Sequence, residues 1–216
     1  MSCRIAELES KKQGTLIILD NGEQIWISRH LLGECPLSIE QEGEIDPDVL
    51  KEWMMPRQYQ SALHYAVDLL AKQDRASGEI KQKLEAKKYL PDTIEMVLYK
   101  LETEHFLNDQ TFAKNYAQAK SRAHVGKNKI RWALKQKGID RETIDEAIDA
   151  INVEEAAESA VHYAKQLIIR YRKEPDPRKR QQKALAAMAR RGYDYENSRS
   201  ALAAAADDFF SVEDEQ

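Results

Sequence analysis

The side chains best suited to catalysis or metal binding in this chain of 216 residues are five histidines and two cysteines, and their spacing favours neither role. No histidine belongs to a His-Glu-x-x-His pattern or adjoins a nucleophile motif, and the eight glycines form no phosphate-binding loop. His64 and Asp68 share one face of an expected helix, where a surface hydrogen bond explains them better than a pair of metal ligands. Cys3 and Cys35 have no further ligand at metal-binding spacing. We therefore expect a protein that is not an enzyme and holds no metal or cofactor.

Lysine and arginine are strongly clustered, although the net charge is −4. Residues 110–139 contain eight basic and no acidic residues, and residues 165–191 contain ten basic and two acidic residues. Such blocks are typical of a surface for a polyanion or for an acidic protein face, and the alternative is a solvated helix face. The residues that we expect to contact a partner or DNA are Lys120, Arg122, Lys127, Lys129, Arg131, Trp132, Lys135, Arg170, Arg172, Lys173, Arg178, Lys179, Arg180 and Lys183.

Trp132 stands out within the first basic block. At about 100° per residue, Ile130 and Leu134 define the buried stripe of the expected helix, and Trp132 points almost opposite to that stripe, beside Lys129 and Lys135. An outward tryptophan offers a large apolar area at small entropic cost, which is typical of an interface anchor. The alternative is that Trp132 packs on another helix or on the N-terminal segment.

The second basic block spans the end of one expected helix and the start of the next. Cations at residues 170–173 complement the dipole of the helix that ends there, so local stabilisation can account for them. Asp176 and Pro177 begin the next helix, whose first turn holds Arg178, Lys179 and Arg180. Cations at this end oppose the dipole. A binding partner is therefore the better explanation of these three residues.

The composition and local patterns predict a mostly helical protein that begins with a small β unit. With 42% hydrophobic and 32% charged residues but only eight glycines and six prolines, a large all-β fold is disfavoured. Residues 15–19 and 24–28 flank an Asp-Asn-Gly turn and predict a hairpin, to which residues 5–9 could add a third strand. Asp46 and Pro47 then begin a helix that we expect to run to about Met55 and to end at Pro56.

The rest of the chain contains a pattern that occurs three times. Leu84, Leu134 and Met188 are equivalent, at offsets of 50 and 54 residues, and each lies in the middle helix of a three-helix unit. Gly138 and Gly192 are placed for left-handed helix C-caps, whereas the first copy has Lys88 at that position. Asp140 and Asp194 are well placed to begin the following helices.

These patterns give the expected architecture. It is an all-α fold of three tandem three-helix repeats forming an elongated, curved molecule, with a small N-terminal β-hairpin unit. The expected parts are 1–58 for the hairpin unit and a short helix, 59–107, 108–152 and 153–206 for the three repeats, and 207–216 for an acidic tail. No apolar run of about 18 residues indicates a membrane span or export, so we expect a cytoplasmic protein, which we take to be a monomer.

The spacing of several residues resembles that of the RecX family of bacterial regulators. The resemblance extends from about residue 59 to 150, and the positions that carry it are Tyr65, Ala66, Leu69, Leu70, Arg75, Glu79, Ile80, Lys83, Leu84, Ile94, Val97, Leu98, Leu101, Phe106, Leu107, Asn108, Asp109, Phe112, Ala113, Arg122, Gly126, Ile130, Leu134, Lys137, Gly138 and Ile139. The chain departs from the family pattern at Ala76, Lys88 and Asn108, all at expected helix ends.

The resemblance implies a partner and a function. RecX proteins modulate the RecA recombinase, and the resemblance implies that the chain lies in the groove of the RecA nucleoprotein filament, bridges adjacent subunits and inhibits filament growth. It would thereby suppress ATPase activity, strand exchange and repressor cleavage, with roles in recombination, DNA repair and the SOS response. Two alternatives stay open. The first is a helical repeat protein that binds single-stranded DNA without sequence preference, and contact with double-stranded DNA also stays open. The second is a generic helical-repeat adaptor whose charges are merely solvated.

Overall fold

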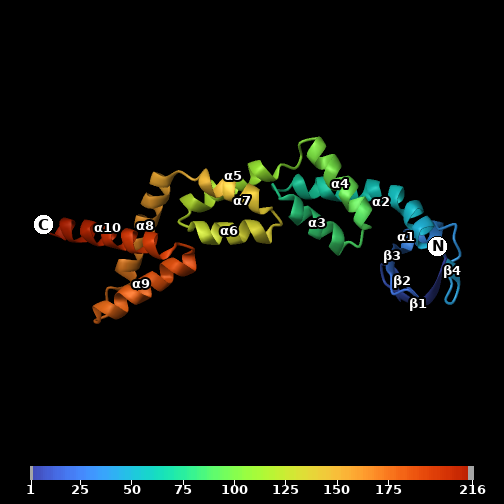
Figure 1. Cartoon of the computed structure of the whole chain (residues 1–216), viewed down its shortest axis with the longest axis horizontal. Helices are drawn as coiled ribbons and strands as arrows, with labels where there is room; N and C mark the ends of the chain where they lie inside the picture. The colour runs from blue at the N-terminus through green and yellow to red at the C-terminus, as the bar shows by residue number, and fades with distance from the viewer. Residues whose placement is uncertain (1, 214–216) are drawn as a thin grey trace. The chain divides into compact units, whose positions relative to one another are not determined.

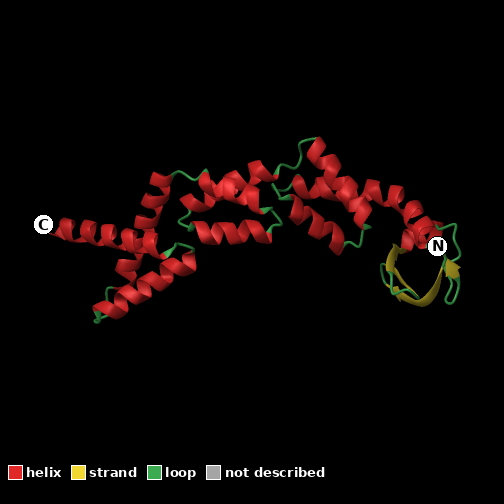
Figure 2. Cartoon of the chain, viewed as in Figure 1, coloured by secondary structure: helices red, strands yellow, loops and turns green. Residues whose placement is uncertain are grey.

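The computed structural model of the chain describes residues 2–213 and the side chains of residues 2–206. It is mostly helical with a small N-terminal sheet, in agreement with the sequence prediction (Figure 2). The chain divides into two compact units. The first unit runs to Arg75 and includes Glu79–Leu107, and the second consists of Ala76–Gly78 and the residues from Asn108 onward.

The first unit begins with a four-stranded antiparallel sheet. Strands β1 (Cys3–Lys11), β2 (Gly14–Leu19), β3 (Gln24–Ser28) and β4 (Glu44–Ile45) lie in the order β3-β2-β1-β4 (Figure 1). The predicted hairpin and its third strand are confirmed, and Gly22 in the hairpin turn adopts a φ of 85°. Strand β4 and the short helix α1 (Arg29–Glu34) were not predicted, because two and six residues are too short to show a periodic pattern.

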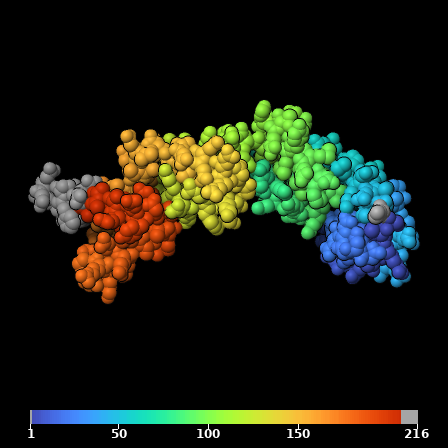
Figure 3. All heavy atoms as spheres, in the orientation of Figure 1, coloured from blue at the N-terminus to red at the C-terminus, as the bar shows by residue number. Residues whose placement is uncertain are grey.

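Alternation of side chains gives this sheet one buried face. Ile17, Ile25 and Ile27 are at most 2% exposed and pack against Leu50 and Met54 of helix α2 (Pro47–Leu70). The atoms of the sheet and of α2 form one contiguous body in the space-filling view (Figure 3).

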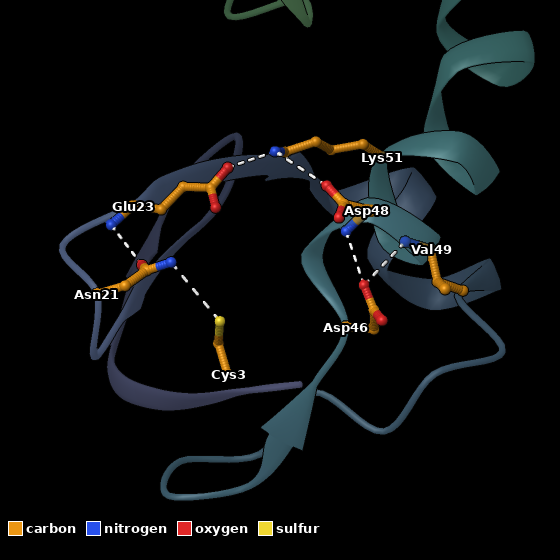
Figure 4. A network of polar contacts seen from close by, with 7 residues as sticks. All are labelled: Cys3, Asn21, Glu23, Asp46, Asp48, Val49 and Lys51. Carbon is orange, nitrogen blue, oxygen red and sulfur yellow. Dashed lines mark hydrogen bonds and ion pairs between the residues drawn. The ribbon is translucent and has the colours of Figure 1, made fainter. Parts of the chain in front are cut away.

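Polar contacts fix the start of α2 (Figure 4). As expected for an N-cap, Asp46 Oδ1 accepts hydrogen bonds from the backbone N–H of Asp48 at 3.1 Å and of Val49 at 3.4 Å. Lys51 forms an ion pair with Glu23, the residue just before strand β3, so the helix is tied to the hairpin. That pairing raises the pKa of Lys51.

The predicted end of this helix near Met55 is wrong, because α2 continues to Leu70 with Pro56 inside it. Pro56 has no N–H to donate to the carbonyl of Glu52, but both residues are exposed, so water can replace the missing partner. Buried side chains hold the helix on either side of the proline, at Met54 and Gln58. Tertiary packing therefore overrides the local signal to stop.

The second half of α2 packs against two further helices. Ala62 and Ala66 of α2 lie in one core with Ile80 and Leu84 of α3 (Ser77–Ala86), and Ile94, Val97 and Leu101 of α4 (Pro91–Thr103) complete this core. Gln58 Oε1 accepts a hydrogen bond from the N–H of Leu90 at 2.9 Å. The boundary predicted between residues 58 and 59 thus falls inside one continuous helix that serves both the sheet and the helical core.

Up to Glu213, where the described residues end, the second unit contains six whole helices in two groups, each with its own core. The helices of the first group are α5 (Asp109–Arg122), α6 (Lys127–Gln136) and α7 (Arg141–Asp149), and those of the second are α8 (Val153–Tyr171), α9 (Pro177–Arg191) and α10 (Tyr195–Glu213). Ile130, Leu134 and Ile148 lie in the first core, and Leu167 and Met188 lie in the second. Helix α10 continues past Ala206, where the third repeat was expected to end; the rest of the predicted acidic tail, residues 214–216, lies outside the described residues.

The predicted helix ends of this unit are confirmed. Gly138 and Gly192 adopt left-handed φ values of 81° and 97°. Asp140 accepts a hydrogen bond from the N–H of Thr143 at 2.9 Å and Asp194 one from the N–H of Asn197 at 2.8 Å, so each carboxylate caps the helix that follows it.

A contact between glycines positions helix α6. The N–H of Gly126 donates to the carbonyl of Arg191 at 3.0 Å, and the N–H of Asn128 donates to the carbonyl of Gly192 at 3.1 Å. A Cβ on Gly126 would lie 2.2 Å from the carbonyl carbon of Gly192, so only glycine fits. The end of α9 therefore supplies the partners for the first N–H groups of α6, whose N-cap has no side chain to do so.

Candidate functional site

Helix α6 presents an exposed tryptophan between two lysines. Ile130 and Leu134 are at most 1% exposed, whereas Trp132 on the opposite side is 62% exposed. Lys129 and Lys135, three residues before and after Trp132, are also exposed. The first turn of α6 contains no acidic residue. We call Lys129, Trp132 and Lys135 the α6 surface.

Carboxylates pair with only part of the predicted cationic set within the described chain. Arg122 lies 3.5 Å from Glu155, Arg131 lies 3.2 Å from Asp145, and Lys183 forms an ion pair with Glu174 that lowers the pKa of Glu174. Lys120 Nζ lies 5.3 Å from the centre of the Tyr116 ring. Of the 14 predicted residues, only Lys127 and Arg180 are half-buried, and the others are exposed.

The structure places the predicted residues in two separate groups rather than on one continuous surface. The first group lies on α5 and α6. The second lies around the α8–α9 loop, at the N-terminal end of α9, whereas the C-terminal end of α9 meets α6 at Gly192 (Figure 1). The 15 residues of α9 span about 22 Å at 1.5 Å per residue, so they separate Arg178 and Lys179 from the α6 surface.

The start of α9 has the charge distribution that the sequence predicted. Asp176 Oδ1 accepts hydrogen bonds from the N–H groups of Arg178 and Lys179, at 2.9 and 3.3 Å. The first turn contains no acidic residue, so Arg178 and Lys179 lie at the positive end of the helix dipole without local compensation beyond the cap.

The α5–α6 loop is fixed by contacts that the sequence analysis missed. The side chain of Arg191 donates to the carbonyls of His124 and Ala123, at 2.7 and 2.8 Å. The ring of His124 stacks on that of His162 at 4.4 Å, and its Nδ1 lies 2.8 Å from Ser159 Oγ. Burial lowers the pKa of His124, and the charges of His162 and Arg191 lower it further. No pattern in the sequence joins these residues, because 67 positions separate His124 from Arg191.

Within residues 2–213, no group of three His, Cys, Asp or Glu side chains is placed to hold a metal ion. His64 Nε2 and Asp68 Oδ2 lie 3.5 Å apart on a surface where both side chains are exposed. A membrane-spanning helix, long and apolar enough to cross a bilayer, is not found in the described part of the chain.

Comparisons with known proteins identify one family. The family model described as RecX, second three-helix domain, matches residues 108–148, and that described as RecX, first three-helix domain, matches residues 62–101. A regulatory protein RecX of Clostridium perfringens (strain 13 / Type A) is 28% identical over 159 residues, which cover 73% of this chain and 74% of the relative. A regulatory protein RecX of Mannheimia succiniciproducens is 36% identical over 88 residues, covering 40% of this chain and 58% of the relative.

Solved structures lead to the same family. A crystal structure of regulatory protein RecX superposes with a TM-score of 0.62 at 26% identity and covers 91% of this chain and 97% of the solved chain. RecX from Lactobacillus salivarius gives a TM-score of 0.63 at 22% identity, covering 69% of this chain and 97% of the solved chain, and supports the fold alone.

Proposed function

The chain belongs to the RecX family, and from this membership we propose that it regulates the RecA recombinase by binding the RecA nucleoprotein filament. One observation of the structure carries the proposal. Trp132 is 62% exposed and lies between Lys129 and Lys135, and neither lysine has a carboxylate partner among the described residues. A large apolar side chain framed by unpaired cations fits a partner with an apolar pocket and an acidic rim.

The proposed mechanism is occupation of the filament groove. The α6 surface docks on one recombinase subunit, and the cations around the α8–α9 loop contact a neighbouring subunit or exposed DNA phosphates. Because the two groups are separated by the length of α9, one molecule can bridge two sites. Bridging opposes the rearrangements that filament growth, ATPase activity, strand exchange and repressor cleavage require. ATP belongs to the recombinase, and the regulator itself is not an enzyme.

We also propose that the helices form three repeats, at residues 59–107, 108–152 and 153–206, each built on a three-helix core. The separate cores of α2–α4, α5–α7 and α8–α10 support this division. The protein acts in the cytoplasm as a monomer.

Truncation of Trp132 tests the proposal. Trp132→Ala should raise the concentration that half-inhibits RecA ATPase on single-stranded DNA by about 30-fold, because removing an interface anchor costs on the order of 2 kcal/mol. Tyr99→Ala is the matched control, since Tyr99 is a 72% exposed aromatic residue of the first unit. An unchanged midpoint for a folded Trp132→Ala protein would reject the anchor.

A second candidate function is sequence-nonspecific binding of single-stranded DNA, with inhibition arising from competition for DNA. The cations around the α8–α9 loop and on α6 that have no carboxylate partner among the described residues favour it. Its affinity should fall with salt at a log–log slope of about −0.7 per phosphate contact. Inhibition that persists in a large excess of DNA would support filament binding and contradict this second function.

A further inference from the structure

The first unit contains a cleft that plays no part in the proposed function. Its volume is about 390 Å³, and it lies between the end of β3, helix α1, the middle of α2 and the α3–α4 loop. A volume of this size is within the range of small-molecule sites. The side chains that give it its chemistry are Trp26, Arg57, Gln58, Lys87, Lys88 and Tyr89.

The charge of this cleft is positive. Arg57, Lys87 and Lys88 line it, and none of the three has a carboxylate partner within the described chain. Aromatic rings and a carbonyl hold two of these cations in place. The guanidinium of Arg57 lies 4.3 Å from the centre of the Trp53 ring and donates to the Trp53 carbonyl at 2.9 Å, and Lys87 Nζ lies 5.3 Å from the centre of the Tyr65 ring.

The opposing charge in the cleft is small. Glu34 is the one acidic residue among those that line it, and it already lies 3.2 Å from Nδ1 of His30. The remaining cations are thus available to an anion, and phosphate is an anion that both Arg and Lys side chains bind.

Two aromatic side chains provide the apolar part of the site. Trp26 and Tyr89 line this cleft and also an adjoining cleft of about 300 Å³, and Lys88 borders both. Both rings are half-buried. Trp26 lies on the sheet face opposite the buried Ile25 and Ile27, and Tyr89 lies in the loop that follows α3. Aromatic walls beside cations are the combination that holds a stacked base and its phosphate.

Lys88 provides an independent argument from the backbone. It adopts a φ of 65°, a left-handed conformation that strains a residue with a side chain, whereas the equivalent positions of the other two repeats are Gly138 and Gly192. Backbone strain of this kind concentrates at functional sites. In this repeat the strained position is a lysine that lines both clefts.

We propose that this cleft binds one nucleotide unit, with the base against Trp26 or Tyr89 and the phosphate among Arg57, Lys87 and Lys88. The unit comes from single-stranded nucleic acid or from a free nucleotide, since both offer the same chemistry. The site lies in the first unit and is distinct from the α6 surface of the second.

Replacement of Lys88 by glycine separates binding from folding. In the full-length protein at low salt, Lys88→Gly should weaken binding of a fluorescein-labelled 20-mer of thymidylate about five-fold or more, through loss of a charge-assisted phosphate contact. The temperature of half-unfolding should stay the same or rise by a few degrees, because glycine relieves the positive φ. Lys72→Gly is the matched control. It removes the same charge from an exposed turn of the same unit that lines neither cleft.

Two further measurements locate the ligand and identify its source. Photocross-linking of a 4-thiothymidine oligonucleotide to the wild-type protein should label peptides that contain Trp26 or Tyr89. Unlabelled thymidine monophosphate and unlabelled oligonucleotide are then compared as competitors at equal nucleotide concentration. If thymidine monophosphate abolishes the cross-links, the site binds a free nucleotide. If only the oligonucleotide abolishes them, the site binds a strand.

The proposal is overturned if Lys88→Gly and Lys72→Gly bind alike, or if cross-links occur only in the second unit. Neither outcome bears on recombinase regulation, because no recombinase is present in these assays. Conversely, if Trp132→Ala causes no defect in recombinase inhibition, the proposed function fails, but the expected cross-linking at Trp26 and Tyr89 does not change.

Discussion

At the scale of single residues, the α5–α6 loop depends on a histidine that is kept neutral. His124 has a φ of 58° and packs between the ring of His162 and the hydroxyl of Ser159, with the guanidinium of Arg191 bonded to its carbonyl. Protonation of His124 would place a charge in a half-buried position next to Arg191, so the folded state disfavours it. The loop that precedes the α6 surface is therefore coupled to pH.

Acidification should destabilise the protein through His124. The pKa of His124 in the folded protein lies below the usual value of about 6.5. As pH falls, His124 therefore binds a proton in the unfolded chain before it does so in the folded protein. The stability that is present above the usual pKa is lost as the pH approaches the folded pKa. The temperature of half-unfolding should fall between pH 7.5 and 5.5, and His124→Asn should reduce that fall, because asparagine tolerates a positive φ and does not titrate. An identical pH dependence in the variant would contradict this role.

Residues that act on their near neighbours were predicted, and residues that act across the fold were not. The capping by Asp46 and Asp140 and the left-handed glycines at 138 and 192 follow from rules that operate within about four positions. The exposure of Trp132 likewise follows from helical periodicity. The Arg191 bonds to the α5–α6 loop depend on tertiary packing, about which the sequence contains no periodic signal.

At the scale of elements, helix α2 is the clearest case in which packing overrides a local signal. Pro56 is a strong reason to end a helix, yet Met54 is fully buried against the sheet core and Gln58 is hydrogen-bonded to the start of α4. These contacts hold both sides of the proline in one helix of 24 residues. The sequence could predict the beginning of α2 but not its length.

Replacing the internal proline should stabilise the first unit. Pro56→Ala restores an N–H for the carbonyl of Glu52 and should raise the free energy of unfolding by about 1–2 kcal/mol, after allowance for the greater freedom of the unfolded chain. Pro47→Ala is the matched control with the opposite sign, since Pro47 is buried at the first position of α2, where proline is favoured. Urea unfolding followed by circular dichroism measures both. Destabilisation by Pro56→Ala would mean that the proline sets a bend that the packing of α2 requires.

At the scale of the whole molecule, sequence repetition predicted the helical cores but not the contacts between segments that lie far apart in the sequence. Equivalent apolar positions such as Leu84, Leu134 and Met188 are all buried, because each core depends on a short, repeated pattern. The separation of the predicted cations into two groups was not predicted, since it depends on the direction in which α9 leaves its contact with α6. Periodicity determines which face of a helix is buried and leaves the placement of that helix open.

Helix α3 illustrates how a segment can be capped from a distant position. Ala76, the residue before it, has no side-chain oxygen that could cap the helix, and the carboxylate of Asp109 acts instead. Asp109 Oδ1 accepts from the N–H of Ser77 at 2.8 Å, and Asp109 Oδ2 accepts from Ser77 Oγ at 2.6 Å. Ser77 is the first residue of α3, and Ser77 and Asp109 both belong to the second unit.

Removal of this cap should therefore loosen α3 more than the helix that contains the mutation. Asp109→Ala should cost about 1–2 kcal/mol and speed amide hydrogen exchange in the first turn of α3, although the substituted residue lies in α5. Asp140→Ala is the matched control, because Asp140 caps the helix that directly follows it and should speed exchange in α7 alone. Unchanged exchange in α3 of the Asp109→Ala protein, measured by mass spectrometry, would show that packing of Ala76 and Ile80 holds the helix start without the carboxylate.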